Sequence, residues 1–474
     1  MGKMKNLKRR QFLKMAGLGT IGASLYSLGC QRQNKVKKFN IIYIMTDDLG
    51  YGDLGCYGQK QVQTPNIDKM AKEGMLFTDH YAGSTVCAPS RCSLMTGLHT
   101  GHTFVRGNRE VKPMGQIPIP AATMTVAEYL KQAGYSTGLI GKWGLGAPDT
   151  EGIPNRQGFD YFFGYLCQRH AHNYYPEFLF RNEERVPLEG NRVGVPRPDG
   201  AGVAVERAQY SHDLMAEESL DFIERNKDKP FFLYMALTIP HANNQAGDEG
   251  MEVPDLGIYA DKDWPDPEKG KAAMITRMDK DVGRVFEKLK ELNIDKHTLV
   301  IFTSDNGPHR EGGAQPEYLN SSGPLRGIKR DLYEGGIRVP LIARCPGTIK
   351  PNTTTDHISA FWDFLPTACD IAGVDSPSGI DGISYLPVLL GNKQPQHKYL
   401  YWEFYGRGFK RAVRMGKYKY VQVGVNNPFE LYDLEIDLGE KNNIAEKHPE
   451  LIAGVKELLK TVRTESEYWK IPEV

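Results

Sequence analysis

The feature that most constrains the fold of this chain is a repeated pattern in which an apolar, strand-like run stops abruptly at polar residues. Such runs cover residues 39–46, 136–140, 231–238 and 299–304. Continuous apolar runs are typical of strands that are buried on both faces. Helix-like stretches lie between them, and the alternation predicts an α/β fold with a large, mainly parallel sheet sandwiched by helices. One such stretch places an apolar face at Ile275, Met278, Val282, Phe286 and Leu289.

The polar residues that end these runs are the first candidates for function. Open parallel sheets bind ligands beyond the carboxyl ends of their strands, so we expect these side chains to lie close together. Three carboxylates and one amide form an all-oxygen donor set, which suits Ca²⁺ or Mg²⁺ better than zinc. Polar residues that simply face water would give the same pattern. The set is Asp47, Asp48, Lys142, His241, Asp305 and Asn306.

A second candidate is the segment 84–97. We predict a helix with Pro89 as its first residue and Gly97 as its end. Cys87 then lies at a helix N-terminus, where unpaired N–H groups favour anions, and Arg91 follows one turn later. The alternative is that Cys87 is a small buried hydrophobe, which is the commoner role of a lone cysteine.

The motif Cys87-Ala88-Pro89-Ser90-Arg91 resembles the C-x-P-S-R signature of the formylglycine-dependent (type I) sulfatases, in the alkaline phosphatase-like superfamily. The resemblance implies hydrolysis of sulfate monoesters on a sulfatase-like α/β fold. It also implies that Cys87 is oxidised after translation to formylglycine, whose hydrated aldehyde supplies the nucleophilic oxygen. A formylglycine-generating or sulfatase-maturating enzyme would then be a partner.

Further motifs extend this resemblance from about residue 40 to residue 346. It implies that Asp47, Asp48, Asp305, Asn306 and the modified Cys87 bind Ca²⁺, or Mg²⁺ in its place. It also implies that Arg91 orients the nucleophile, that Lys142 and Lys329 bind the sulfate group, and that His241 protonates the leaving oxygen with help from Lys329. Residues 430–434 and 443–445 resemble the C-terminal pattern of the family.

The chain departs from the family at residue 144. Many sulfatases carry Lys-Trp-His-Leu-Gly here, and their histidine aids sulfate release, whereas this sequence has Gly144. His170, His172 or a water molecule are the candidates for the missing base. The same two histidines could instead be a metal pair, or have a loop or core role.

Loops near these motifs are expected to select the substrate. Polar side chains with Tyr174 and Tyr175 suit a hydroxylated ring, so we predict a sulfated carbohydrate. A role as solvated loop residues is the alternative for each of them. The predicted substrate-binding residues are Arg106, Asn108, His170, His172 and His309.

The ends of the chain suggest export and a second domain. Lys8 to Lys14, followed by an apolar run, resemble a twin-arginine signal, and Cys30 ends a lipoprotein-like cleavage site, so we expect a bacterial periplasmic protein or a membrane-anchored lipoprotein. The predicted units are residues 1–30 as signal, 38–385 as catalytic domain and 386–474 as C-terminal subdomain. In the last, strand-like runs cover 399–405 and 418–423, and a helix covers 449–463. Residues 181–210 read as an insertion.

Composition excludes some classes and leaves two rivals. A net charge of +1 argues against a general nucleic-acid binder, and seven unevenly spaced cysteines imply no disulfide framework or zinc set. One rival is a phosphoester hydrolase of the same superfamily, which would usually need two metals and several histidine ligands. The other is a glycan-binding protein that leaves Cys87 as a thiol and catalyses nothing.

Overall fold

The computed structural model describes residues 38–473. The predicted export signal, Cys30 included, lies outside the described residues. Within them, no helix combines the length and the apolar character needed to cross a bilayer.

A sheet of ten strands forms the centre of the molecule, in the order β13-β2-β12-β11-β1-β10-β4-β5-β6-β7. The strands β11, β1, β10, β4 and β5 run parallel, whereas β12, β6 and β7 are antiparallel to their neighbours, so the prediction of a mainly parallel sheet is confirmed. The bounds are β1 (Asn40–Thr46), β2 (Met75–Phe77), β4 (Ser136–Lys142), β5 (Tyr161–Tyr165), β6 (Phe178–Arg181), β7 (Glu184–Pro187), β10 (Phe231–Ala236), β11 (Thr298–Ser304), β12 (Leu341–Arg344) and β13 (Thr353–Thr355).

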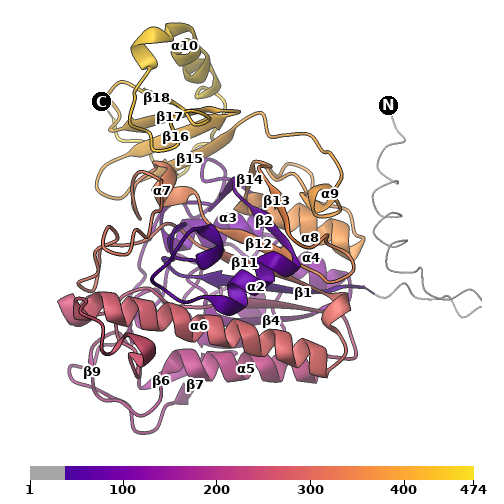
Figure 1. Ribbon diagram of the computed structural model, residues 1–474, viewed down its shortest axis with the longest axis vertical. Coiled ribbons are helices and arrows are strands. Elements are labelled where there is room, and N and C mark those ends of the chain that lie inside the picture. Colours follow the sequence, from indigo (N-terminus) through magenta and orange to yellow (C-terminus); the bar gives the residue numbers. More distant parts are fainter. Residues whose placement is uncertain (1–37, 474) are drawn as a thin grey trace, which may run out of the picture.

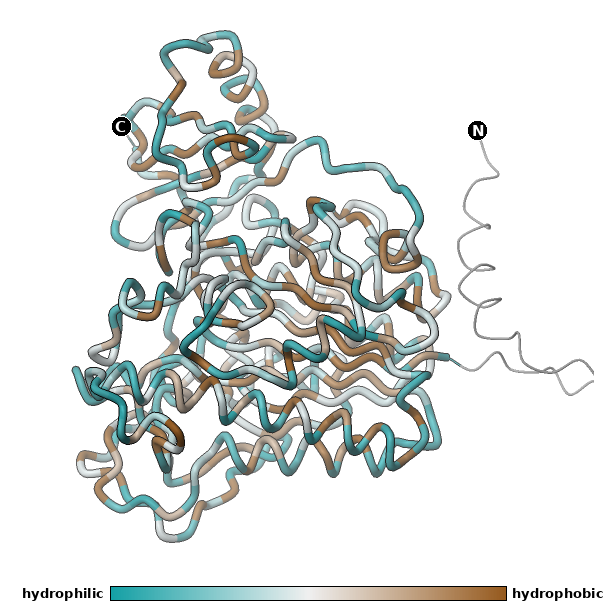
Figure 2. The backbone as a smooth tube through the Cα atoms, in the orientation of Figure 1, coloured by the Kyte–Doolittle hydropathy of each residue, from teal (hydrophilic) through white to brown (hydrophobic). Residues whose placement is uncertain are grey.

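Helices cover both faces of this sheet, because its central strands are apolar on both sides. In β1, Ile41 and Tyr43 belong to one hydrophobic cluster and Ile42 and Ile44 to the other, as the alternation of strand side chains requires. Figure 1 shows α5 and α6 side by side along one edge of the molecule, and Figure 2 shows apolar residues concentrated in the central strands. One layer contains α2 (Pro65–Glu73), α5 (Ser211–Arg225) and α6 (Asp266–Glu291); the other contains α3 (Cys87–Thr96), α4 (Val126–Gln132), α8 (Phe364–Ala372) and α9 (Leu386–Leu389).

A smaller antiparallel sheet follows near the C-terminus, with α10 (Pro449–Leu458) beside it (Figure 1). Two of its four strands fall in the predicted runs, and the helix ends five residues earlier than predicted. We did not predict β16 and β18, because the charged residues of β16 hide its alternation. The strands are β15 (Leu400–Phe404), β16 (Lys410–Met415), β17 (Tyr418–Val423) and β18 (Glu430–Asp433).

The remaining short elements connect these layers. The predicted insertion 181–210 contains the small hairpin of β8 and β9, and a second small sheet pairs β3 with β14. Their bounds are β3 (His80–Tyr81), β8 (Arg192–Val193), β9 (Ala204–Glu206), α7 (Glu334–Ile337) and β14 (Ser359–Ala360).

Candidate active site

Four neighbouring strands bring the predicted polar residues to one edge of the sheet. The strands β11, β1, β10 and β4 are consecutive in the sheet and parallel, so their carboxyl ends lie together. Asp47 and Asp48 follow β1, Lys142 ends β4, and Asp305 follows β11. The structure therefore gathers the side chains that the strand pattern predicted.

The carboxylates of this edge form one buried cluster. Asp48 has a φ of 66°, an uncommon backbone state for a residue other than glycine, and its N–H donates to Asp305 Oδ1 over 3.2 Å. Asn306 donates from Nδ2 to Asp48 Oδ1 over 2.7 Å, and the other polar atom of its amide is Oδ1. That oxygen is buried and has no hydrogen-bond partner. Asp47, Asp48, Asp305 and Asn306 are all at most 1% exposed.

Two lysines bind opposite ends of the carboxylate cluster. Lys142 Nζ lies 2.5 Å from Asp47 Oδ2, and Lys329 Nζ lies 2.7 Å from Asp48 Oδ2. Burial by itself would raise the pKa of both aspartates, but the lysines outweigh burial and hold each pKa below its usual value. Burial and the neighbouring Asp47 raise the pKa of Asp305 to about 7. The cluster therefore sets three buried carboxylates against an equal number of buried cations, two lysines and one arginine.

Arg91 ties three strand ends together. Its Nη1 donates to the carbonyl of Lys142 over 2.6 Å, and its Nη2 lies 2.9 Å from Asp305 Oδ2 and 3.5 Å from Asp47 Oδ2. Both terminal nitrogens are therefore engaged in positioning the cluster.

Cys87 is the first residue of α3, and it points into this cluster. The helix starts two residues before Pro89, which corrects the predicted start, and it ends as predicted at Gly97, with a φ of 72°. Cys87 Sγ lies 3.4 Å from Asp47 Oδ1 and 3.3 Å from Lys142 Nζ. Burial and Asp47 raise the pKa of the thiol to about 12, so an unmodified Cys87 would be a neutral, poor nucleophile at neutral pH.

His241 and Lys329 form the other end of the site. His241 Nδ1 lies 2.6 Å from the carbonyl oxygen of Ala242, so Nδ1 carries the proton and Nε2 offers a lone pair to Lys329 Nζ at 3.0 Å. Burial and Lys329 lower the pKa of His241 to about 4, so the ring is neutral. Lys329 keeps its proton, because Asp48 and Glu311 outweigh burial and raise its pKa.

Glu311 is a site residue that we did not predict from the sequence. Its carboxylate lies 3.3 Å from Lys329 Nζ, 3.9 Å from His241 Nε2 and in contact with Arg330. The only sequence signal was its place seven residues after the end of β11. Its partner Arg330 comes from a segment whose position the sequence does not reveal.

The structure places the predicted substrate-binding residues in different surroundings, some beside the site and some away from it. Asn108 is exposed and accepts from the N–H of Ala88 over 3.1 Å, beside Cys87. His309 is fully buried; its Nδ1 accepts from the N–H of Glu311, so its Nε2 donates to the carbonyl of Pro240. His309 therefore positions Glu311 and the loop that carries His241.

Two tyrosines expected to face a sugar are buried instead. Tyr174 is 0% exposed and Tyr175 6% exposed. The hydroxyl of Tyr174 donates to the carbonyl oxygens of Thr238 and His241, so it holds the loop that carries His241.

The two histidines of the His-x-His motif have different surroundings. The His170 ring lies between Tyr165 and Phe178, at centroid distances of 4.9 and 4.6 Å, and belongs to the core rather than to the site. The His172 ring stacks on His241 at 4.6 Å with an angle of 15° between the planes. The two rings thus lie in different surroundings, and of the two only His172 adjoins the site.

Arg106, predicted to bind substrate, instead forms an ion pair with the C-terminal sheet. It is 2% exposed, and its Nη1 lies 2.8 Å from Oε1 of the buried Glu403 in β15. Its Nε donates to the carbonyl of Thr103 over 3.0 Å. The placement of Arg106 therefore contradicts a substrate-binding role.

Replacing Arg106 by alanine is expected to destabilise the fold by about 3 kcal/mol, because it leaves Glu403 buried without its main cation. Urea unfolding would measure the loss. KM for the substrate should stay within about twofold, because Arg106 lies outside the charged cluster. A large rise in KM with unchanged stability would contradict this assignment.

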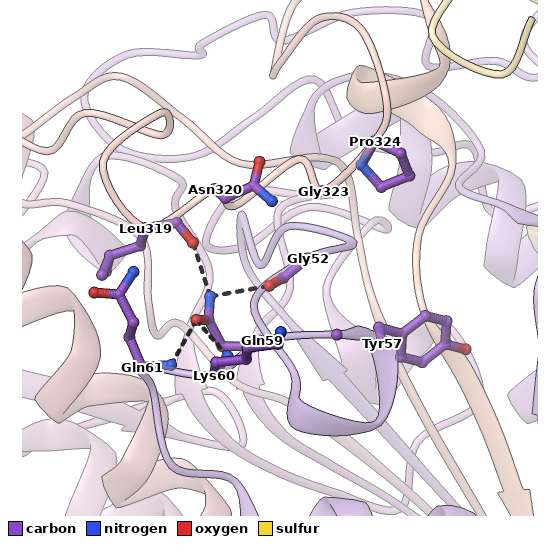
Figure 3. A pocket seen from close by; sticks show the side chains of 10 residues that line it. Gly52, Tyr57, Gln59, Lys60, Gln61, Leu319, Asn320, Gly323 and Pro324 are labelled. Carbon is purple, nitrogen blue, oxygen red and sulfur yellow. Dashed lines mark hydrogen bonds between the residues drawn. The ribbon is translucent and has the colours of Figure 1, made fainter.

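A separate cavity of 540 Å³ opens beside the segment that follows Asp48 (Figure 3). The carboxamide of Gln59 crosses its wall and donates to the carbonyls of Gly52 and Leu319. No residue of the charged cluster lines this cavity, so it is not part of the site.

Comparison with known proteins supports a common family for most of the chain. The family described as Sulfatase matches residues 39–374, and the family described as N-sulphoglucosamine sulphohydrolase, C-terminal, matches residues 328–465. An N-acetylgalactosamine-6-O-sulfatase of Bacteroides thetaiotaomicron is 31% identical, over 97% of this chain and 100% of that protein. Arylsulfatase A of Homo sapiens is 34% identical, over 88% of this chain and 86% of its own.

Solved structures show the same architecture. The crystal structure of Ps i-CgsB in complex with k-i-k-neocarrahexaose superposes with a TM-score of 0.76 at 28% identity, covering 90% of this chain and 93% of that one. A phosphonate monoester hydrolase of Agrobacterium radiobacter superposes with a TM-score of 0.62 at 22% identity, covering 90% of this chain and 95% of that one, a likeness of fold alone.

Proposed function

This chain belongs to the sulfatase family and is a sulfuric ester hydrolase, and we propose that it removes sulfate from a sulfated carbohydrate with a formylglycine made from Cys87 and a bound Ca²⁺. The observation that carries the proposal is that Cys87, three carboxylates and two lysines contact one another beyond the carboxyl ends of adjacent strands.

The donor set fits a hard divalent cation. Asp47, Asp48 and Asp305 are buried side by side, and Asn306 Oδ1 is a buried acceptor without a partner. Carboxylate and amide oxygens are the ligands that Ca²⁺ prefers, and a divalent charge would stabilise the ionised form of Asp305, whose pKa burial and the neighbouring Asp47 raise. When bound, the cation would neutralise charge on the sulfate oxygens.

The surroundings of Cys87 fit a modified rather than a free thiol. A buried thiol with a pKa of about 12 is a weak nucleophile, so the unmodified side chain suits catalysis poorly. When formed, the hydrated formylglycine would supply the oxygen that attacks sulfur. The helix N-terminus and Lys142, at 3.3 Å from Sγ, provide positive potential at that position.

The remaining residues bind the ester and manage its proton. Lys142 and Lys329, which contact Asp47 and Asp48, would hold the charged sulfuryl oxygens while the electrons of the breaking S–O bond move to the leaving oxygen. The proton for the departing oxygen would pass through the pair of His241 and Lys329, whose Nε2 and Nζ lie 3.0 Å apart. This modifies the predicted order, in which His241 donates with help from Lys329, because Nε2 of His241 carries a lone pair and the shared proton is on Lys329. The net reaction converts the sulfate ester and water into an alcohol, sulfate and a proton.

Relatives support a carbohydrate as the substrate. One curated relative is named an N-acetylgalactosamine-6-O-sulfatase, and a structural neighbour was solved with a neocarrahexaose. Turnover of a panel of sulfated mono- and oligosaccharides would test this choice. Hydrolysis of simple aryl sulfates alone, with no sugar sulfate accepted, would contradict it.

The rival phosphoester hydrolase predicts a different preference. Sulfate monoesters carry one negative charge and phosphate monoesters nearly two at neutral pH, and the three buried carboxylates beside the lysines disfavour the extra charge. We expect kcat/KM for a sugar sulfate to exceed that for the matching sugar phosphate by at least about 100-fold. A preference for phosphate in paired assays would overturn the sulfatase proposal.

Export to the periplasm, with or without a lipid at Cys30, remains part of the proposal, and it is supported by the paired arginines and apolar run of the first 30 residues. Fractionation of the native host, with Cys30→Ser as the comparison, would test it. Enzyme found only in the cytoplasm would contradict export.

A further inference from the structure

The space beside Gly144 is filled by another side chain. Gly144 has a φ of 80°, and a Cβ added there would lie 1.9 Å from Nε2 of Gln168. Gln168 is 4% exposed, and neither its Nε2 nor its Oε1 has a hydrogen-bond partner. Position 144 therefore cannot carry a histidine in this fold unless Gln168 moves. The space that a side chain at 144 would fill is taken by the Gln168 carboxamide, which makes no hydrogen bond.

His172 lies close to the catalytic groups from a different strand connection. It follows β5, and its ring stacks on His241. Its Nδ1 is buried and has no hydrogen-bond partner. A buried nitrogen without a hydrogen-bond partner lowers stability, so a ligand that bonds to His172 would explain why it is there.

The surroundings of His172 keep its imidazole neutral. Burial lowers its pKa well below the usual value, and His241, Lys142 and Lys329 lower it further. Its imidazole is therefore neutral and offers one N–H and one lone pair. The ring on which it stacks, His241, lies 3.0 Å from Nζ of Lys329, one of the two cations assigned to the sulfate group.

Hydrogen bonds on both sides fix the position of His172. Tyr165 donates its hydroxyl to the carbonyl of Asn173 over 2.7 Å. Tyr174 donates to the carbonyls of Thr238 and His241, which ties the His172 segment to the His241 loop. These hydrogen bonds hold the two loops that carry His172 and His241, and so they keep the two rings stacked.

We propose that His172 is a further substrate-contacting residue, which hydrogen-bonds the sulfate group beside His241 and Lys329 and replaces the imidazole that position 144 cannot provide. This inference rests on the proposed function. A neutral donor can orient a sulfate oxygen without adding charge next to two ammonium groups, so it complements them.

The test measures sulfate binding rather than turnover. Inorganic sulfate would be titrated calorimetrically into Ca²⁺-loaded Cys87→Ser protein, which cannot turn over. His172→Phe keeps an aromatic ring for stacking but has no N–H, and His172→Gln keeps a donor. We expect the phenylalanine variant to bind sulfate about tenfold more weakly, and the glutamine variant to stay within about threefold of the parent.

Controls separate this inference from the proposed function. His448 lies immediately before α10, and His448→Ala should leave sulfate binding unchanged. Thermal unfolding would verify that each variant folds. If His172→Phe does not fold, His172→Ala takes its place. Equal affinity in the donor-free variant and the parent would overturn the role of His172 alone. A parent protein that binds no sulfate would overturn the proposed function and this inference with it.

Discussion

Replacing Cys87 by alanine is expected to lower kcat/KM on a sulfate ester by a factor of about 10⁵, because the variant keeps the charged cluster but loses the nucleophile. The side chain contributes little to packing beyond a small buried volume, so the variant should fold. Its Ca²⁺-dependent stabilisation should weaken but persist, because Asp47, Asp48, Asp305 and Asn306 remain. Steady-state assays and thermal unfolding would measure these effects.

The matched control for this variant is Cys92→Ala. Cys92 lies in the same helix and is also fully buried, but its thiol belongs to the hydrophobic core. The Cys92→Ala substitution should lower the free energy of unfolding modestly and leave kcat/KM within about threefold of the wild-type value. Mass spectrometry of the peptide that spans residue 87 should find an aldehyde in wild-type protein from the native host. A free thiol in fully active enzyme would disprove the assigned nucleophile.

The strand-end residues could be predicted because burial on both faces leaves a continuous apolar run whose end is easy to locate. Asp47 and Asp305 each follow such a run, and parallel neighbours place them together. The start of α3 was harder to predict, because Pro89 tolerates the third position of a helix as well as the first. The sequence signals there identify a helix but not its first residue.

Residues near a motif in sequence proved harder to assign than residues at strand ends. Arg106 follows the Cys87 segment closely, yet its side chain turns to Glu403, almost 300 positions away. His170 and His172 are two residues apart in one short turn and face different environments. Glu311 depends on Arg330, a contact that only the folded loops create. Side-chain direction in loops has no period, so the sequence pattern does not encode it.

Removal of divalent cations is the second change with a large expected effect. Protein dialysed against a chelator should lose activity by about 100-fold or more and regain it with Ca²⁺, because three buried carboxylates would otherwise compete with the sulfate for Lys142 and Lys329. At about 100 times its Kd, Ca²⁺ should raise the free energy of unfolding by about 2.7 kcal/mol. Mg²⁺ should substitute less well, because it demands a smaller, octahedral site.

Asp48→Asn tests whether this effect arises at the proposed site. The substitution keeps the shape of the side chain but removes one negative charge from the donor set, so Ca²⁺ should stabilise the variant much less than wild-type protein and activity should fall by at least about 100-fold. Asp266→Asn, at a position 90% exposed, is the matched control and should behave as wild type. If Asp48→Asn kept the full Ca²⁺-dependent stabilisation, the cation would have to bind elsewhere. The buried carboxylates would then serve to hold Lys142 and Lys329 in place, and the unpartnered oxygen of Asn306 would need another explanation.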